Sequence, residues 1–182
     1  MPHTVTAEII ELFKNKGGSM YGGESVTQLE HALQCATLAK QNHSTHELIT
    51  ASLLHDVGHL LHDLPTDASD KGIDDLHENL AANYLQKHFK PAVVEAVKLH
   101  VAAKRYLCAV EQGYFESLSN PSKISLQFQG GTMNSDEVAN FESNEFYKEA
   151  ISLRRWDDQA KVANLVSPFV ESFISSIESS LK

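Results

Sequence analysis

An adjacent histidine and aspartate, His55 and Asp56, directly follow the apolar residues 51–54 at the end of a segment with helical periodicity. Burying such an ionisable pair at the end of an apolar helix is costly unless other polar groups satisfy it. Those groups have to come from other parts of the chain. The pair therefore favours a fold that brings distant segments together around residues 55 and 56.

The rest of the chain has the apolar periodicity of amphipathic helices joined by loops. No alternating apolar and polar run of useful length occurs, so the sequence predicts an all-α bundle that forms one domain over residues 1–182. Gly58 is expected to stop the third helix, and Ser135 to act as an N-cap. Residues 64–75 are polar and predict a loop, either a lid or a plain connection. We expect helices over residues 5–16, 26–41, 46–56, 77–88, 91–103, 104–112, 144–163 and 167–181, with shorter ones after residues 120 and 135.

Composition excludes several classes of protein. The 182 residues carry 24 acidic and 15 basic side chains, a formal net charge of -9, which argues against nucleic-acid binding. No apolar run approaches the roughly 20 residues that span a bilayer, and the first residues lack the pattern of a secretory signal. Cys35 and Cys108 form no paired motif and are interpreted as reduced thiols. We expect a cytoplasmic protein that binds neither nucleic acid nor membrane.

Further candidate ligands lie on separate predicted helices, far apart in the sequence: His31, His77, His100 and Asp157. This spacing excludes a zinc finger or a HExxH helix, whose ligands come in close pairs. It suits a bundle in which each helix sends one ligand into the core. On residue type alone, each histidine is more often a hydrogen-bonded core residue or a surface residue. The ordered set, rather than any one member, favours a metal site.

The order His31, His55-Asp56, Asp157 resembles the H…HD…D pattern of the HD-domain superfamily, and His77 with His100 matches the version that holds two metals. The resemblance extends from residue 21 to about residue 161. It implies a helical bundle with a buried dinuclear site bridged by Asp56. His31, His55 and Asp157 would complete one metal, and His77 and His100 the other. Imidazole with carboxylate suits iron or manganese more than calcium.

Residues 21–34, YGGESVTQLEHALQ, are similar to the N-terminal motif of the mixed-valent di-iron oxygenases of this superfamily. The closest branch cleaves 2-amino-1-hydroxyethylphosphonate into glycine and phosphate and is related to myo-inositol oxygenase. The resemblance implies that Tyr21 is a transient iron ligand with a catalytic role, and that Glu24 binds the substrate ammonium. Without it, Tyr21 is a loop aromatic and Glu24 an acid favoured by the helix dipole.

The same resemblance supplies the remaining site residues. His59, one helical turn after His55, is expected to contact the phosphonate and to take part in catalysis, although a solvated helix cap is the alternative. Cationic and hydroxyl side chains close in sequence to the ligands match the family's substrate pattern, although lone lysines and arginines usually face solvent. The further expected substrate contacts are Lys104, Ser122, Arg154 and Lys161.

The expected activity is therefore oxygen-dependent cleavage of (R)-2-amino-1-hydroxyethylphosphonate by an Fe(II)/Fe(III) pair. Its partners are a small organophosphonate and O2. Two alternatives stay open at this stage. One is a dinuclear phosphohydrolase acting on a nucleotide or phosphomonoester with a metal-bound hydroxide. The other is a catalytically silent HD-type module that binds a ligand or partner.

Overall fold

The computed structural model of the protein describes residues 3–61 and 76–182. The loop predicted over residues 64–75 lies outside the described residues. Regular structure in the described ranges is helical, with two isolated antiparallel bridges, between Met20 and Thr27 and between Phe89 and Leu181. The predicted all-α fold class is confirmed.

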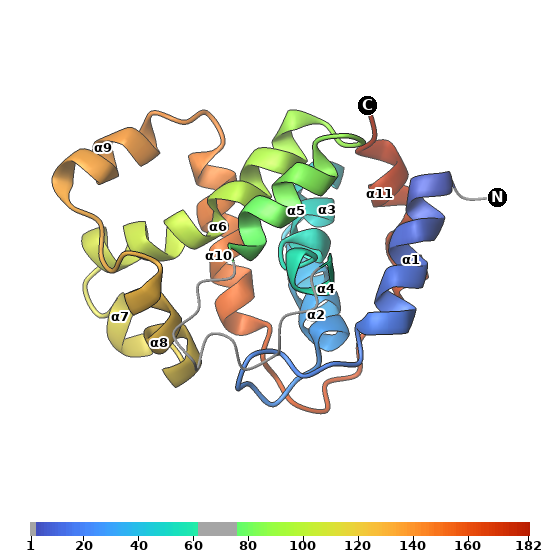
Figure 1. The fold of residues 1–182 in the computed structure, drawn as a ribbon, viewed down its shortest axis with the longest axis horizontal. Coiled ribbons are helices and arrows are strands. Elements are labelled where there is room, and N and C mark those ends of the chain that lie inside the picture. The colour runs from blue at the N-terminus through green and yellow to red at the C-terminus, as the bar shows by residue number, and fades with distance from the viewer. Residues whose placement is uncertain (1–2, 62–75) are drawn as a thin grey trace.

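The helices pack as a bundle with shorter helices at its sides (Figure 1). Helices α2, α3, α6 and α10 form the middle. Helices α1 and α11 lie at one side with both termini, and α7 to α9 lie at the other. In chain order the elements are α1 (Thr4–Lys16), α2 (Gln28–Gln41), α3 (His46–Leu54), α4 (Gly58–Leu61), α5 (His77–Leu85), α6 (Pro91–Val110), α7 (Tyr114–Ser117), α8 (Asn120–Phe128), α9 (Ser135–Glu142), α10 (Tyr147–Gln159), the 3-10 helix η2 (Val170–Phe173) and α11 (Ile174–Ser179).

Local capping fixes where the helices that carry the site begin. Thr27 and Glu30 form a capping box at α2: the Thr27 hydroxyl accepts the Glu30 N–H at 3.2 Å, and the Glu30 carboxylate accepts the Thr27 N–H at 2.7 Å. Thr45 caps α3 as expected, and Ser119 caps α8. Each cap satisfies N–H groups that would otherwise lack a partner. These caps determine the first residue of α2 and of α3, and so which residues of each helix face the core.

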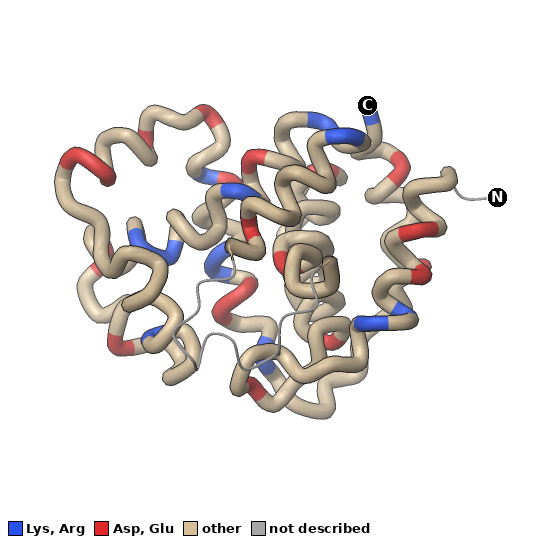
Figure 2. The backbone as a smooth tube through the Cα atoms, viewed as in Figure 1, with Lys and Arg blue, Asp and Glu red and all other residues tan. Residues whose placement is uncertain are grey.

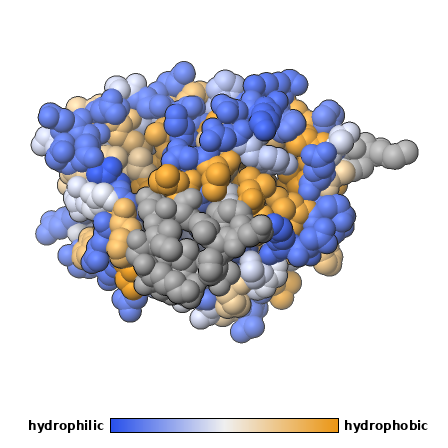
Figure 3. All heavy atoms as spheres, viewed as in Figure 1, coloured by the Kyte–Doolittle hydropathy of each residue, from blue (hydrophilic) through white to orange (hydrophobic). Residues whose placement is uncertain are grey.

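The main apolar core lies between α1, α2, α3, α5, α6, α10 and α11. Its largest fully buried side chains include Leu53, Phe89, Leu153 and Phe173. Two smaller clusters join α6 and α10 to α7, α8 and α9. Hydrophilic residues cover much of the face in Figure 3, and apolar atoms gather beside the residues drawn in grey. The helices thus have the one-sided apolar burial that their sequence periodicity predicts.

The prediction for residues 46–58 is wrong at its end. Helix α3 stops at Leu54, and Gly58 begins α4 rather than ending a helix. A Cβ built on Gly58 would lie 2.0 Å from the carbonyl oxygen of His77. A glycine is required here because the backbones of α4 and α5 meet, and this approach places His55, Asp56 and His77 together.

Other boundaries also differ. Residues 91–110 form the single helix α6, because buried Val101, Ala103 and Leu107 continue its apolar side past the expected break. Asn134 rather than Ser135 caps α9, since the Asn134 side chain accepts the Glu137 N–H. Helix α10 covers 147–159 instead of 144–163, and the predicted terminal helix divides into η2 and α11. Helix α7 was not predicted.

Charged residues of both signs lie along α10. Basic and acidic positions alternate down its length in Figure 2. Arg154 and Asp157 lie on successive turns of α10, and Lys161 follows two residues after the helix ends. No helix of residues 3–61 and 76–182 is both long enough and apolar enough to cross a membrane.

Candidate metal centre

The six predicted ligands meet in the middle of the bundle, and every one of them is buried. They come from five places: α2, the turn between α3 and α4, the first residue of α5, the middle of α6 and the last turns of α10. The structure brings together His31, His55, Asp56, His77, His100 and Asp157.

Asp56 lies between two pairs of histidines. Its Oδ2 is 3.2 Å from His55 Nε2 and 3.5 Å from His31 Nε2. Its Oδ1 is 3.3 Å from His77 Nε2 and 3.5 Å from His100 Nε2. Each carboxylate oxygen thus faces a separate pair of imidazoles, which is the arrangement of a bridging ligand.

Three of the imidazoles are held by backbone carbonyls. The Nδ1–H groups of His31, His55 and His100 donate to the carbonyls of Ala160, Ser52 and Val97 at 2.8, 2.9 and 2.6 Å. This fixes the tautomer and points each Nε2 lone pair inward, as in protein metal sites.

The inward nitrogens come very close to one another. Nε2 of His31 is 3.1 Å from Nε2 of His55, and the same atoms of His77 and His100 are 3.3 Å apart. Among the described residues, the buried Asp56 Oδ2 has no hydrogen-bond donor. Lone pairs and a carboxylate at such distances repel unless a cation lies between them. The donor set therefore fits two metal ions that share Asp56, with Asp157 Oδ1 3.3 Å from His31 Nε2 on one side.

Both carboxylates are held ionised. Burial alone would raise the pKa of Asp56, but the neighbouring His55 and His100 keep it well below its usual range. Burial is likewise outweighed at Asp157, where Arg154 keeps the pKa well below its usual range. Although burial lowers the pKa of His31, Asp157 and Asp56 raise it to about 9, so without a metal its Nε2 carries a proton whose place a bound cation would take. Two buried negative charges surrounded by nitrogen donors form a site for cations.

Tyr21 and His59 lie at the two ends of this cluster. The Tyr21 ring stacks on His31 with centroids 3.9 Å apart, and its hydroxyl is 3.5 Å from Asp157 Oδ1. The His59 ring stacks on His77 at 4.1 Å, and its Nε2 is 3.9 Å from Asp56 Oδ1. Each is therefore within reach of one half of the cluster.

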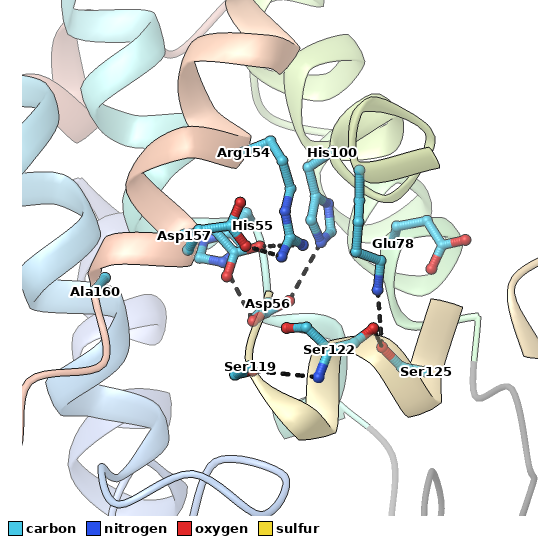
Figure 4. A network of polar contacts seen from close by, with 12 residues as sticks. His55, Asp56, Glu78, His100, Ser119, Ser122, Ser125, Arg154, Asp157 and Ala160 are labelled. Carbon is cyan, nitrogen blue, oxygen red and sulfur yellow. Dashed lines mark hydrogen bonds and ion pairs between the residues drawn. The ribbon is translucent and has the colours of Figure 1, made fainter. Parts of the chain in front are cut away.

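Cationic and hydroxyl groups line the side of the cluster that faces α8 (Figure 4). Lys104 and Arg154 are 3% and 4% exposed, so they do not face solvent. The Lys104 ammonium donates to Ser125 at 2.8 Å, and Lys161 donates to Ser122 at 3.0 Å. Burial, and then the charge of Arg154, lower the pKa of Lys104 to about 7. Arg154 pairs with Asp157 and Asp158, and Lys161 lies beside Glu24, whereas Lys104 has no carboxylate within ion-pair distance among the described residues. Charged N–H donors of this kind are the groups that bind anions most strongly in proteins.

Glu24 lies beside the same wall. Its Oε1 accepts the Ser119 hydroxyl at 2.5 Å and lies 3.1 Å from the Lys161 ammonium. Both contacts fall on one oxygen, and within residues 3–61 and 76–182 none falls on Oε2. One carboxylate oxygen of Glu24 is thus held by two contacts, and the other has none within the described residues.

Four polar residues of the site were missed from the sequence. Ser119 caps α8 and Ser125 lies on it, and the position of α8 over the metal cluster has no local signal. Asp158 follows a predicted ligand directly, and only that adjacency could have singled it out. Tyr114 lies on the unpredicted helix α7 and contacts Arg154. Their roles depend on tertiary packing.

A family model described as the HD domain matches residues 29–157, a range that begins just before His31 and ends at Asp157. The chain belongs to the HD-domain family. The match covers most of the chain and includes all six of the clustered residues, so the predicted superfamily is confirmed.

Three relatives extend the comparison. A protein of Gimesia maris named hydroxymethylphosphonate dioxygenase is 47% identical over 182 residues, all of this chain and 90% of the relative. A protein of Leisingera caerulea named 1-hydroxy-2-(trimethylamino)ethylphosphonate dioxygenase (glycine-betaine-forming) is 42% identical over 157 residues, 86% of this chain and 80% of the relative. An uncharacterized protein of Acanthamoeba polyphaga mimivirus is 38% identical over 157 residues, 85% of this chain and 71% of the relative. The predicted resemblance to phosphonate-cleaving HD-domain oxygenases is confirmed.

Proposed function

We propose that the protein is a dioxygenase that cleaves the carbon–phosphorus bond of a 1-hydroxyphosphonate, with (R)-2-amino-1-hydroxyethylphosphonate as substrate and glycine and phosphate as products. The observation that carries the proposal is the position of Asp56, whose two oxygens face separate histidine pairs beside a wall of buried cations. Two of the relatives are named as dioxygenases of a 1-hydroxyphosphonate, and these names support the class of reaction.

The metals would be two iron ions in the Fe(II)/Fe(III) state. His31, His55 and Asp157 would hold one ion, His77 and His100 the other, and Asp56 both. When bound, they would supply the redox chemistry that activates oxygen. Tyr21 would act as a reversible ligand, since its hydroxyl lies 3.5 Å from Asp157 Oδ1 and its ring stacks on the ligand His31.

The phosphonate would lie against the cationic wall. Lys104, Arg154 and Lys161 supply positive charge, Ser122 supplies a hydroxyl, and His59 closes the end of the cluster nearest His77. Two phosphonate charges in a buried site need charged hydrogen-bond donors, which are the strongest kind. These residues hold the C1–P bond next to the metals and exclude water from it.

The substrate ammonium would bind Oε2 of Glu24. Lys161 and Ser119 fix the other oxygen and keep the carboxylate in place. A hydroxymethylphosphonate has no such ammonium and would leave this contact unused. The position of Glu24 therefore favours an amino-substituted substrate over the unsubstituted one.

The reaction balances with one O2 and no other reductant. A substrate R–CH(OH)–PO3 with two negative charges takes up O2 and gives a carboxylate, hydrogen phosphate and one proton. The substrate supplies all the electrons that reduce the oxygen, and the carbon that bore phosphorus becomes the carboxylate. We further propose that residues 1–182 form one domain and that the protein works in the cytoplasm, where its two free cysteines stay reduced.

Phosphate release from three substrates tests the proposal. Iron-loaded protein is given (R)-2-amino-1-hydroxyethylphosphonate, hydroxymethylphosphonate or the trimethylamino compound, each in air and without oxygen. We expect release only in air and fastest from the primary amine, with glycine as co-product. Release from a phosphomonoester without oxygen would replace the oxygenase with a hydrolase. Faster release from either other phosphonate would keep the reaction and change the substrate.

A further inference from the structure

The guanidinium of Arg154 is fixed on three sides. Its Nη1 lies 2.7 Å from Asp157 Oδ2, its Nη2 bonds Asp158 Oδ1, and its Nε–H donates to the Tyr114 hydroxyl at 3.2 Å. A guanidinium is planar and has five N–H donors. Contacts at three different nitrogens determine the direction of its plane. The remaining donors, on Nη1 and Nη2, then point in a set direction.

Two of these three contacts come from the same helix as Arg154 itself. Asp157 and Asp158 lie three and four residues further along α10. Within the described residues, Tyr114 is the contact that ties the guanidinium to another element, α7. If the Tyr114 hydroxyl were absent, the long Arg154 side chain would be held only along its own helix.

The hydroxyl of Tyr114 has two partners. It accepts from Arg154 Nε and donates to Asp158 Oδ2, while Asp158 Oδ1 accepts from Arg154. The three residues thus form a closed ring of hydrogen bonds. The Tyr114 ring is 6% exposed and packs with Leu107, Leu118 and Leu126, so it cannot move away easily.

We propose that Tyr114 is a positioning residue that acts through Arg154: with Asp158 it orients the guanidinium so that one edge holds the carboxylate of Asp157 and the other edge meets the phosphonate. The identity of the anion rests on the proposed function, whereas the ring of hydrogen bonds does not. Figure 4 shows Arg154 next to Asp157 and directed toward the space between His100 and Asp56. Bidentate binding of a phosphonate oxygen pair needs this kind of fixed plane.

Replacing Tyr114→Phe removes the hydroxyl and keeps the buried ring. The probe is methylphosphonate, which lacks the reactive hydroxyl, titrated calorimetrically into the metal-loaded protein. We expect about a tenfold rise in Kd, the effect of losing one hydrogen bond to a charged group. Metal content and helicity should stay at the wild-type level. In turnover assays, Tyr114→Phe should raise KM for the hydroxyphosphonate more than it lowers kcat.

Tyr106→Phe is the matched control. The Tyr106 hydroxyl also donates to a carboxylate, that of Glu142, at 2.7 Å, and its ring packs on Phe141 in a neighbouring cluster. The Tyr106 ring also packs against the cluster of Leu107, Tyr114, Leu118 and Leu126, but within the described residues its hydroxyl forms no hydrogen bond with Arg154. Its loss should leave methylphosphonate binding unchanged.

A double-mutant cycle separates positioning from packing. If Tyr114 acts through Arg154, then Tyr114→Phe should add little to the loss already caused by Arg154→Lys. The proposal would be overturned if Tyr114→Phe weakened methylphosphonate binding equally in the wild type and in Arg154→Lys. It would also be overturned if Tyr114→Phe left Kd unchanged, or if the wild type did not bind methylphosphonate. If Tyr114→Phe unfolds, Asp158→Asn breaks the same ring and replaces it in the cycle. Weakened binding in a protein that cleaves no hydroxyphosphonate would refute the proposed function and leave the positioning role standing.

Discussion

Replacing Gly58→Ala should disconnect one half of the metal centre. The added Cβ would lie 2.0 Å from the His77 carbonyl oxygen and 2.7 Å from its carbonyl carbon, whereas ordinary contact begins at 3.4 Å. Both neighbours are backbone atoms, so α4 and α5 have to separate by more than about 1 Å. His77 is the first residue of α5 and would move away from Asp56.

The magnitude follows from that separation. Forcing one methyl group into a packed contact costs about 1–3 kcal/mol of the free energy of unfolding, and a misplacement of about 1 Å at a catalytic group can lower the rate about 100-fold. We expect a lower Tm, loss of one of the two metal ions and about 100-fold slower phosphate release. Metal per chain is measured by mass spectrometry after gel filtration. Gly18→Ala is the control, because nothing lies within 4 Å of its Cβ position. Full metal content and wild-type rate in Gly58→Ala would refute this reasoning.

Three further predictions concern the metals, the phosphonate and the ammonium. Asp56→Asn, which keeps the shape but not the charge of the bridge, should bind at most one metal ion per chain; two retained ions would exclude the bridging role. The pKa of Lys104 is lowered to about 7, so the side chain loses its positive charge as the pH rises through 7. Methylphosphonate binding by the wild type should therefore weaken above that pH, and binding by Lys104→Met should not. Parallel pH profiles for the two proteins would contradict this. Glu24→Gln should lower kcat/KM at least tenfold for the primary amine and leave hydroxymethylphosphonate nearly unaffected, whereas equal losses for both would remove Glu24 from ammonium binding.

The metal centre was predictable because its residues are unusual where they occur. A buried His55-Asp56 pair after an apolar segment requires partners, and histidines on other helices, together with Asp157, supply them. Each helix contributes a ligand from a position that its own periodicity turns inward. The order of these residues resembles the HD-domain pattern, and that resemblance selected all six without knowledge of how the helices pack.

The surroundings of the centre were less accessible. Ser119 and Ser125 matter because α8 folds over the cluster, and no local pattern fixes that packing. Tyr114 lies on a four-residue helix that is too short to give a periodic signal. The role of Gly58 was misjudged, since a glycine after a helix usually ends it, whereas here it permits contact with a segment far along the chain.

The ratio of oxygen consumed to phosphate released tests the central claim most directly. Iron-loaded protein is supplied with (R)-2-amino-1-hydroxyethylphosphonate in a closed oxygen-electrode cell, and phosphate and glycine are measured at intervals. Oxygenative cleavage predicts one O2 consumed for each phosphate and each glycine. Phosphate released without oxygen uptake, or oxygen uptake without phosphate, would contradict the account.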